Sequence, residues 1–113
     1  MKNLVICAGC LVASLSIFAQ APETYKGEIM DSQCAALGGH QIMEQKGESA
    51  KDCTNRCVNM GGRYTLFDPA TKTAYQLDDA KKAATFAGTK VSVTGTLNAA
   101  TKTIHVASIK AGS

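Results

Sequence analysis

Four side chains of this chain have types and spacing suited to metal chemistry, and they all lie within residues 27–60. They are Cys34, His40, Cys53 and Cys57. Thiolate sulfur and imidazole nitrogen together form closed, tetrahedral Zn(II) sites, and sets rich in sulfur also suit Cu(I). We therefore expect a soft-metal site built from these four residues, with Zn or Cu as the candidate ion.

A helix is expected to carry two of these ligands. Cys53 and Cys57 are four residues apart in the segment 49–60, so they lie one turn apart on the same helix face. Ser49 or Asp52 can cap the start of this helix. Thioether sulfur near the thiolates would favour Cu(I), and three methionines lie in the same stretch: Met30, Met43 and Met60.

A disulfide is the competing prediction for the same cysteines. Cys53 and Cys57 project side by side from a helix and are poor mutual partners, so the bond would join Cys34 with Cys53 or Cys57. Closing a loop of about twenty residues would contribute about 3 kcal/mol. One thiol would then stay free, to be redox-sensitive or to bind a partner. Three inert, buried thiols are the remaining alternative.

No catalytic constellation accompanies these residues. Beyond the first 19 residues, the sequence lacks a Cys-x-x-Cys redox motif, a Gly-rich phosphate loop and a Ser elbow. His105 alternates with Ile104 and Val106, so we expect it to face solvent and not to bind a metal. Asp31 can either orient His40 or cap a helix. We expect a binding protein and not an enzyme.

The first 19 residues have the pattern of a signal peptide. A lysine, an apolar run and the small residues Ala19-Gln20-Ala21 follow in order. This predicts that residues 20–113 form one domain that is periplasmic or secreted. Disulfides are common in these compartments. Removing Lys2 leaves 11 basic and 9 acidic side chains. A net charge this small gives no reason to expect nucleic acid as a partner.

Alternating and turn-forming residues predict the rest of the fold. Five strands are expected at residues 24–30, 63–68, 73–77, 90–97 and 103–109, with helices at 49–60 and 78–87. Residues 34–50 should form a loop, with a helical turn on either side of Gly38-Gly39. The order corresponds to a mainly β, five-stranded OB-fold-like barrel, with a Cys-rich insertion between the first two strands and a short helix between the third and fourth.

A second function class remains open on the sequence. Tyr64, Phe67 and Tyr75 lie on the middle hairpin, where OB-folds often present aromatic rings to ligands. The alternative to a metal site is therefore a disulfide-stapled module that binds a peptide, glycan or protein partner.

These motifs together resemble a family of small exported bacterial proteins that is defined only as a domain of unknown function. The resemblance rests on the segment Gly27–Cys34 with His40 downstream, on Cys53–Val58, on the Tyr64 strand and on the strand 90–97. It implies an OB-like C-terminal part and shared cysteines. It implies no established activity.

Overall fold

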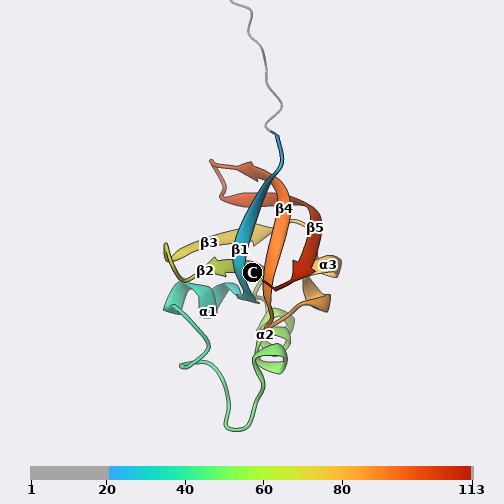
Figure 1. Cartoon of the computed structure of the whole chain (residues 1–113). Helices are drawn as coiled ribbons and strands as arrows, with labels where there is room; N and C mark the ends of the chain where they lie inside the picture. Colours follow the sequence, from blue (N-terminus) through green and yellow to red (C-terminus); the bar gives the residue numbers. More distant parts are fainter. Residues whose placement is uncertain (1–20, 113) are drawn as a thin grey trace, which may run out of the picture.

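The computed structural model describes residues 21–112. The expected signal peptide, residues 1–19, lies outside the described residues. The elements run in the order β1 (Glu23–Asp31), α1 (Ser32–Leu37), α2 (Ala50–Asn59), β2 (Tyr64–Asp68), β3 (Thr73–Leu77), α3 (Ala80–Thr85), β4 (Lys90–Asn98) and β5 (Thr103–Ala111) (Figure 1).

The five strands form one sheet that closes on itself. Neighbouring strands follow the order β1-β2-β3-β5-β4, and β4 pairs back with β1. All pairs are antiparallel except β3 with β5, which is parallel. The predicted mainly β chain with five strands is confirmed, as are the helix between the first two strands and the helix between the third and fourth.

A bulge interrupts the last strand where the alternation of the sequence slips. Thr94 pairs with Ser108 but its neighbour Gly95 pairs with Val106, which leaves Ala107 as an extra residue on β5. The apolar alternation of the sequence slips after Val106, and this slip predicts a bulge near Ala107, as the structure confirms. It lets the residues on both sides keep their apolar side chains turned inward.

Glycine at position 27 is required by a close approach between strands. A Cβ atom here would overlap the carbonyl oxygen of Phe67 on the neighbouring strand β2. Gly27 thus allows β1 to pass tightly over β2 and to bend between its pairings with β4 and β2.

The sheet separates two apolar clusters. Successive residues of a strand point to opposite faces, so Ile29 enters the interior of the ring while Met30 packs outside it with the cysteines. Leu66 and Phe67 of β2 divide in the same way. The interior cluster also holds Leu77, Ala83, Val91, Val93, Ile104 and Val106. We call the outer group, which contains Met30, Cys34, Ala35, Cys53, Cys57 and Phe67, the cysteine cluster.

Helices α1 and α2 cover the outer face of β1 and β2 at one end of the sheet (Figure 1). The loop between them extends beyond that end, and the β4–β5 turn lies at the opposite end. Residues 34–50 were expected to be mostly loop. The helical turn expected before Gly38-Gly39 is confirmed and begins earlier, as α1 at Ser32–Leu37, because Asp31 caps it and Cys34 and Ala35 become buried.

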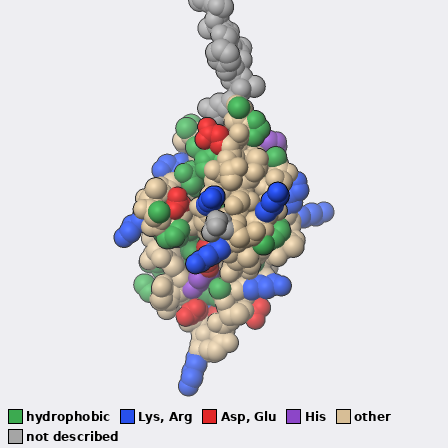
Figure 2. Space-filling model, viewed as in Figure 1, with side chains coloured by type: hydrophobic (Ala, Val, Ile, Leu, Met, Phe, Trp, Pro, Cys, Tyr) green, Lys and Arg blue, Asp and Glu red, His purple; other side chains and the backbone are tan. Residues whose placement is uncertain are grey.

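Charged side chains are spread over the visible surface. Lys and Arg lie at separate positions on the face drawn in Figure 2, with Asp and Glu between them. Within residues 21–112, no helix combines the length and apolar character needed to cross a membrane.

Candidate metal centre

The two helices of the insertion bring three cysteines into one buried cluster. Cys34 comes from α1, and Cys53 and Cys57 come from successive turns of α2. All three are buried free thiols. The expected shared face for Cys53 and Cys57 is confirmed, and Ser49 is the residue that caps their helix, through its hydroxyl and the N–H of Asp52.

Short-range capping fixes the direction in which α1 presents its cysteine. The Oδ2 atom of Asp31 accepts a hydrogen bond from the N–H of Gln33 at 2.8 Å, as expected for an N-cap. The helix ends at Gly38, whose φ of 86° lies in the left-handed region that favours glycine. Cys34 is therefore carried on a helix with defined ends, directly after the last residue of β1.

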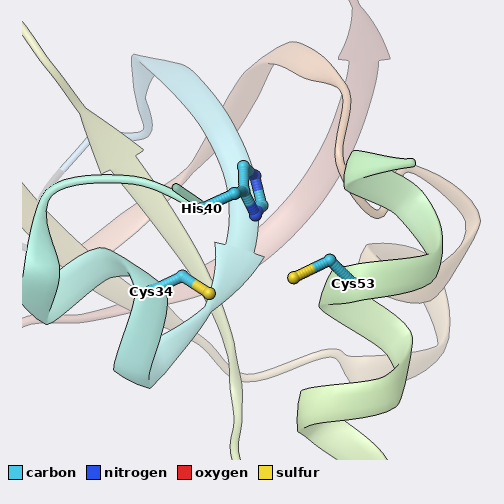
Figure 3. A group of neighbouring side chains, drawn as sticks. All are labelled: Cys34, His40 and Cys53. Carbon is cyan, nitrogen blue, oxygen red and sulfur yellow. The ribbon is translucent and has the colours of Figure 1, made fainter. Parts of the chain in front are cut away.

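The first set of candidate ligands consists of Cys34, His40 and Cys53. One ligand atom from each residue lies within 4.8 Å of the others. Figure 3 shows the two sulfur atoms pointing toward each other from α1 and α2, with the His40 ring above the space between them. Two sulfurs bound to one zinc ion lie about 3.8 Å apart, from a Zn–S bond of about 2.3 Å. Small side-chain movements would therefore suffice to bind an ion.

The ring of His40 is oriented by a carboxylate, and its other nitrogen is left without a partner. The Nε2 atom lies 2.7 Å from Oε2 of Glu28. The Nδ1 atom is buried and has no hydrogen-bond partner among the described residues. A carboxylate that holds one ring nitrogen and leaves the other free to bind an ion is the usual arrangement around a histidine ligand.

Glu28, and not Asp31, is the residue that orients His40. Side chains two apart on a strand share a face, so Glu28 lies on the same face of β1 as Met30, the face that α1 and α2 cover. Asp31 ends the strand and caps α1 instead. Two roles were open for Asp31. The prediction that it orients the ring of His40 is wrong, and the prediction that it caps a helix is confirmed.

A second set of candidate ligands shares Cys34 with the first. It consists of Asp31, Cys34 and Cys57, again with one ligand atom of each within 4.8 Å of the others. The four residues predicted as one site are thus distributed over two overlapping sets. Asp31 was not among the ligands predicted from the sequence. It lies three residues before Cys34, a spacing that places two side chains about one helical turn apart and could have indicated a shared site.

Arginine 56 holds the loop that carries His40 against α2. Its guanidinium donates to both carboxylate oxygens of Glu48, at 2.8 and 3.0 Å, and to the carbonyl of Met43 at 2.8 Å. The hydrogen bond from Arg56 lowers the pKa of Glu48 to about 2, assisted by the N–H of Gln45. The loop therefore has an attachment to α2 that is separate from the bond between His40 and Glu28.

Burial favours the protonated thiol form of Cys34 and Cys53 when no metal is bound. It raises the pKa of Cys34 to about 12, and the neighbouring Cys53 and Cys57 act in the same direction. Burial also raises the pKa of Cys53, with Cys57 and Glu48 adding to the effect. Low thiol pKa values mark nucleophilic cysteines, so these shifts disfavour a reactive thiolate. A metal ion would replace the thiol protons.

The three methionines have different environments. Met30 is buried in the cysteine cluster and Met43 packs against it. Met60 is 76% exposed, because α2 ends at Asn59 and Met60 forms its C-cap. Met60, seven residues after Cys53, would share the face of Cys53 and Cys57 if the helix continued through it, and this expectation is wrong. Only the first two methionines remain candidates for thioether contacts with an ion.

The remaining histidine lies away from the cluster. His105 is exposed on β5, as expected, and its Nδ1 atom lies 2.5 Å from Oδ2 of Asp78. Of the aromatic residues expected to form a ligand-binding face, Phe67 is in the cysteine cluster, while Tyr64 and Tyr75 pack against the interior one.

A pocket of about 390 Å³ opens next to His40. Its lining includes Glu28 and His40, with Glu44 and Lys90 as further charged residues and Met30 and Phe67 as apolar ones. The histidine edge of the cluster is thus the side that faces a solvent-accessible space.

No family model, curated protein or solved structure matches this chain significantly. The geometry of the cysteine cluster is therefore the basis for proposing a function.

Proposed function

We propose that this chain is a non-enzymatic domain that binds a soft or borderline metal ion, Zn(II) or Cu(I), through Cys34, Cys53 and Nδ1 of His40. Cys57 lies in the same cluster. The three ligand atoms converge from α1, from α2 and from the loop between them. No single element of the fold would form the site without the other two.

The observation that carries this proposal is the buried Nδ1 atom of His40, which has no partner among the described residues, in a side chain that forms one ligand set with two thiols. An unsatisfied buried polar atom costs about 1–3 kcal/mol. A metal ion at this position would accept the nitrogen lone pair and remove that cost. The bond from Glu28 leaves the Nδ1 atom free to act as the ligand.

Sulfur donors limit the choice of ion. Two thiolates and one imidazole favour Zn(II) or Cu(I) over hard ions such as Mg(II) and Ca(II), which prefer oxygen ligands. The thioether of Met30 in the cysteine cluster adds weight to Cu(I). A fourth ligand would complete a tetrahedral zinc site.

The fold and the compartment belong to the same proposal. The strand order β1-β2-β3-β5-β4 in a closed sheet, with α3 between β3 and β4, supports an OB-fold. The N-terminal pattern supports export to the periplasm or beyond. The resemblance to the small exported family is proposed on the same cysteine motifs.

Intact mass measurement with thiol alkylation tests this function. The mature protein, purified from its oxidising compartment, should show a native mass excess that matches zinc or copper. After denaturation it should take up three alkyl groups. The variant His40→Gln should bind the ion more weakly, whereas the control variant Gln41→Ala, at an exposed neighbouring position, should bind it as the native chain does.

A disulfide-stapled binding module is the second candidate, favoured by the proximity of the Cys34 and Cys53 sulfurs, which lie within 4.8 Å. The pocket beside His40 would then take part in binding a peptide, glycan or protein. One alkylated thiol after denaturation and no bound metal would support this candidate and contradict the metal site.

A further inference from the structure

Two ligand sets meet at one sulfur atom in the cysteine cluster. Cys34 belongs both to the set with His40 and Cys53 and to the set with Asp31 and Cys57. Cysteine sulfur has several lone pairs, so one thiolate can bind two ions at once. The second set has not been used by the proposed function.

The second set contains its own buried polar atom without a partner. Asp31 is fully buried, and while its Oδ2 atom caps α1, its Oδ1 atom has no hydrogen-bond partner among the described residues. Each set of ligands therefore includes a residue with one such atom: His40, through Nδ1, in the first set and Asp31, through Oδ1, in the second. An orphaned carboxylate oxygen next to two thiols is a second, independent sign of a cation.

Glycine at position 62 leaves space beside this carboxylate. A Cβ atom there would overlap Oδ1 of Asp31 and would lie 3.1 Å from the carbonyl oxygen of Cys57. Any other residue at this position would push on the carboxylate of the second set. The chain thus keeps open the side of Asp31 that no protein donor fills.

Charge balance favours two ions over one. Three thiolates and the Asp31 carboxylate carry four negative charges in a buried cluster, and His40 is a neutral ligand. A single divalent ion bound to all of them would leave two negative charges without compensation, which is costly in a buried site. Two divalent ions would neutralise the cluster.

We infer that the cysteine cluster holds two divalent metal ions bridged by the Cys34 thiolate. One ion binds Cys53 and His40, and the other binds Cys57 and Asp31. This inference rests on the proposed metal-binding function and gives its stoichiometry. The ions have different ligands, since one receives nitrogen and the other receives carboxylate oxygen.

Titration of the reduced mature protein with Zn(II) alone, followed by native mass spectrometry, tests the inference. The native chain should take up two ions. Asp31→Asn should take up one, because the amide still caps α1 but is a poor zinc ligand. The control Asp52→Asn changes an exposed acid on α2 that belongs to neither set, and it should still bind two.

Cys57→Ser supplies a second variant that removes a ligand of the same ion without touching the cap of α1, and it should also bind one zinc. Loading the native chain with ¹¹³Cd should give two NMR resonances that are scalar-coupled through the shared sulfur. Cys34→Ser removes the ligand that both ions share, so it should lose the pair of coupled resonances.

The two proposals fail in different ways. If the native chain binds no zinc under reducing conditions, the proposed function is wrong and the inference falls with it. If the native chain binds a single ion, and both Asp31→Asn and Cys57→Ser also bind one, the function stands and the binuclear site is excluded. Two uncoupled cadmium signals would overturn the bridging role of Cys34.

Discussion

At the scale of single residues, the pair of Glu28 and His40 decides how a metal ion would be held. The Nε2 atom of His40 lies 2.7 Å from Oε2 of Glu28. Only 12% of the histidine side chain and 24% of the glutamate side chain are exposed. A carboxylate at this distance fixes the ring orientation and makes the opposite nitrogen a better donor. Glu28 would therefore tune the site without touching the ion.

Glu28→Gln should weaken metal binding while leaving the number of ions unchanged. The amide can keep a hydrogen bond to the ring but removes the negative charge, and loss of such a partner typically lowers metal affinity by about 10–100-fold. Competition between the protein and a chromophoric zinc chelator would measure the change.

Glu44→Gln is the matched control, because Glu44 lines the same pocket and belongs to neither ligand set. If both variants weaken binding equally, the effect comes from the charge of the pocket and not from the hydrogen bond to His40.

At the scale of elements, Arg56 is the main link between α2 and the loop after α1. The guanidinium bonds to Glu48 and to the carbonyl of Met43, while the loop's own backbone bonds are few and local. Two of these backbone bonds involve His40, whose carbonyl oxygen accepts hydrogen bonds from the N–H groups of Met43 and Glu44. The position of His40 thus depends on a side chain from the opposite helix.

Arg56→Gln should loosen this loop and leave the sheet unchanged. Amide hydrogen exchange in residues 39–48 should become several-fold faster, because local opening no longer breaks the bonds to the guanidinium. Residues in β4 and β5 should exchange at the native rate.

Arg63→Gln serves as the comparison, since Arg63 is exposed and its guanidinium makes one long bond, 3.4 Å, to Gln76. Faster exchange throughout the sheet of Arg56→Gln would mean that the link stabilises the whole domain, contrary to this expectation.

The junction between β3 and α3 is fixed to β5 by Asp78. Partial burial alone would raise the pKa of this carboxyl group, but the N–H of Val106 and the ring of His105 outweigh it, so the pKa lies below its ordinary value of 3.8. A lowered pKa means that the ionised group stabilises the fold above pH 3.8, and that this contribution is lost as the pH falls below it.

Asp78→Asn should therefore lower the free energy of unfolding at neutral pH, and the difference from the native chain should shrink below pH 3.8. Urea unfolding across this range would measure it. His105→Gln, which removes one of the two bonds, should give an intermediate effect. A difference that stays constant with pH would show that the ionised carboxylate does not contribute.

At the scale of the whole molecule, the cysteine cluster and the interior of the sheet are separate. Interior residues such as Val91 and Ile104 make one core, and the cysteines belong to the other. The strands β1 and β2 lie between the two. We therefore expect the contacts that close the sheet to persist when no metal is bound.

Zinc should raise the midpoint of thermal unfolding of the reduced protein, and a chelator should lower it again. An ion that binds only the folded state stabilises it by about 2.7 kcal/mol when free metal is a hundredfold above the dissociation constant. Cys34→Ser should keep its far-UV circular dichroism but should lose the response to zinc.

The substitution Met60→Leu, at an exposed position outside the cluster, should retain the full response. Loss of the β signal in metal-free Cys34→Ser would show instead that the two cores fold as one unit.

Much of this architecture is predictable from local sequence. The alternation of Val91 and Val93 defines β4, the phase slip after Val106 marks the bulge, and the spacing of Cys53 and Cys57 predicts a shared helix face. The repeated segment Ala-Thr-Lys-Thr predicts two similar turns. In both, a lysine takes a positive φ and two threonine hydroxyls bond to each other.

Contacts between distant segments could not be predicted from the local sequence. The pairing of Glu28 with His40 depends on how the loop folds back over β1, and local spacing contains no information about that path. Helix α1 has only six residues and no apolar period, so its formation depends on the cap at Asp31 and on burial. The division of the ligands into two sets likewise follows from the relative placement of α1 and α2.

The pairing of β1 with β4 has a consequence for the kinetics of folding. Glu23 lies opposite Gly95, whereas the residues of the cysteine cluster all fall between Met30 and Phe67. Loop closure over a long stretch of chain is slow compared with the formation of local contacts. During synthesis, one edge of β1 must therefore stay unpaired until nearly the entire chain has emerged, while the cysteine segment can already have collapsed beside it.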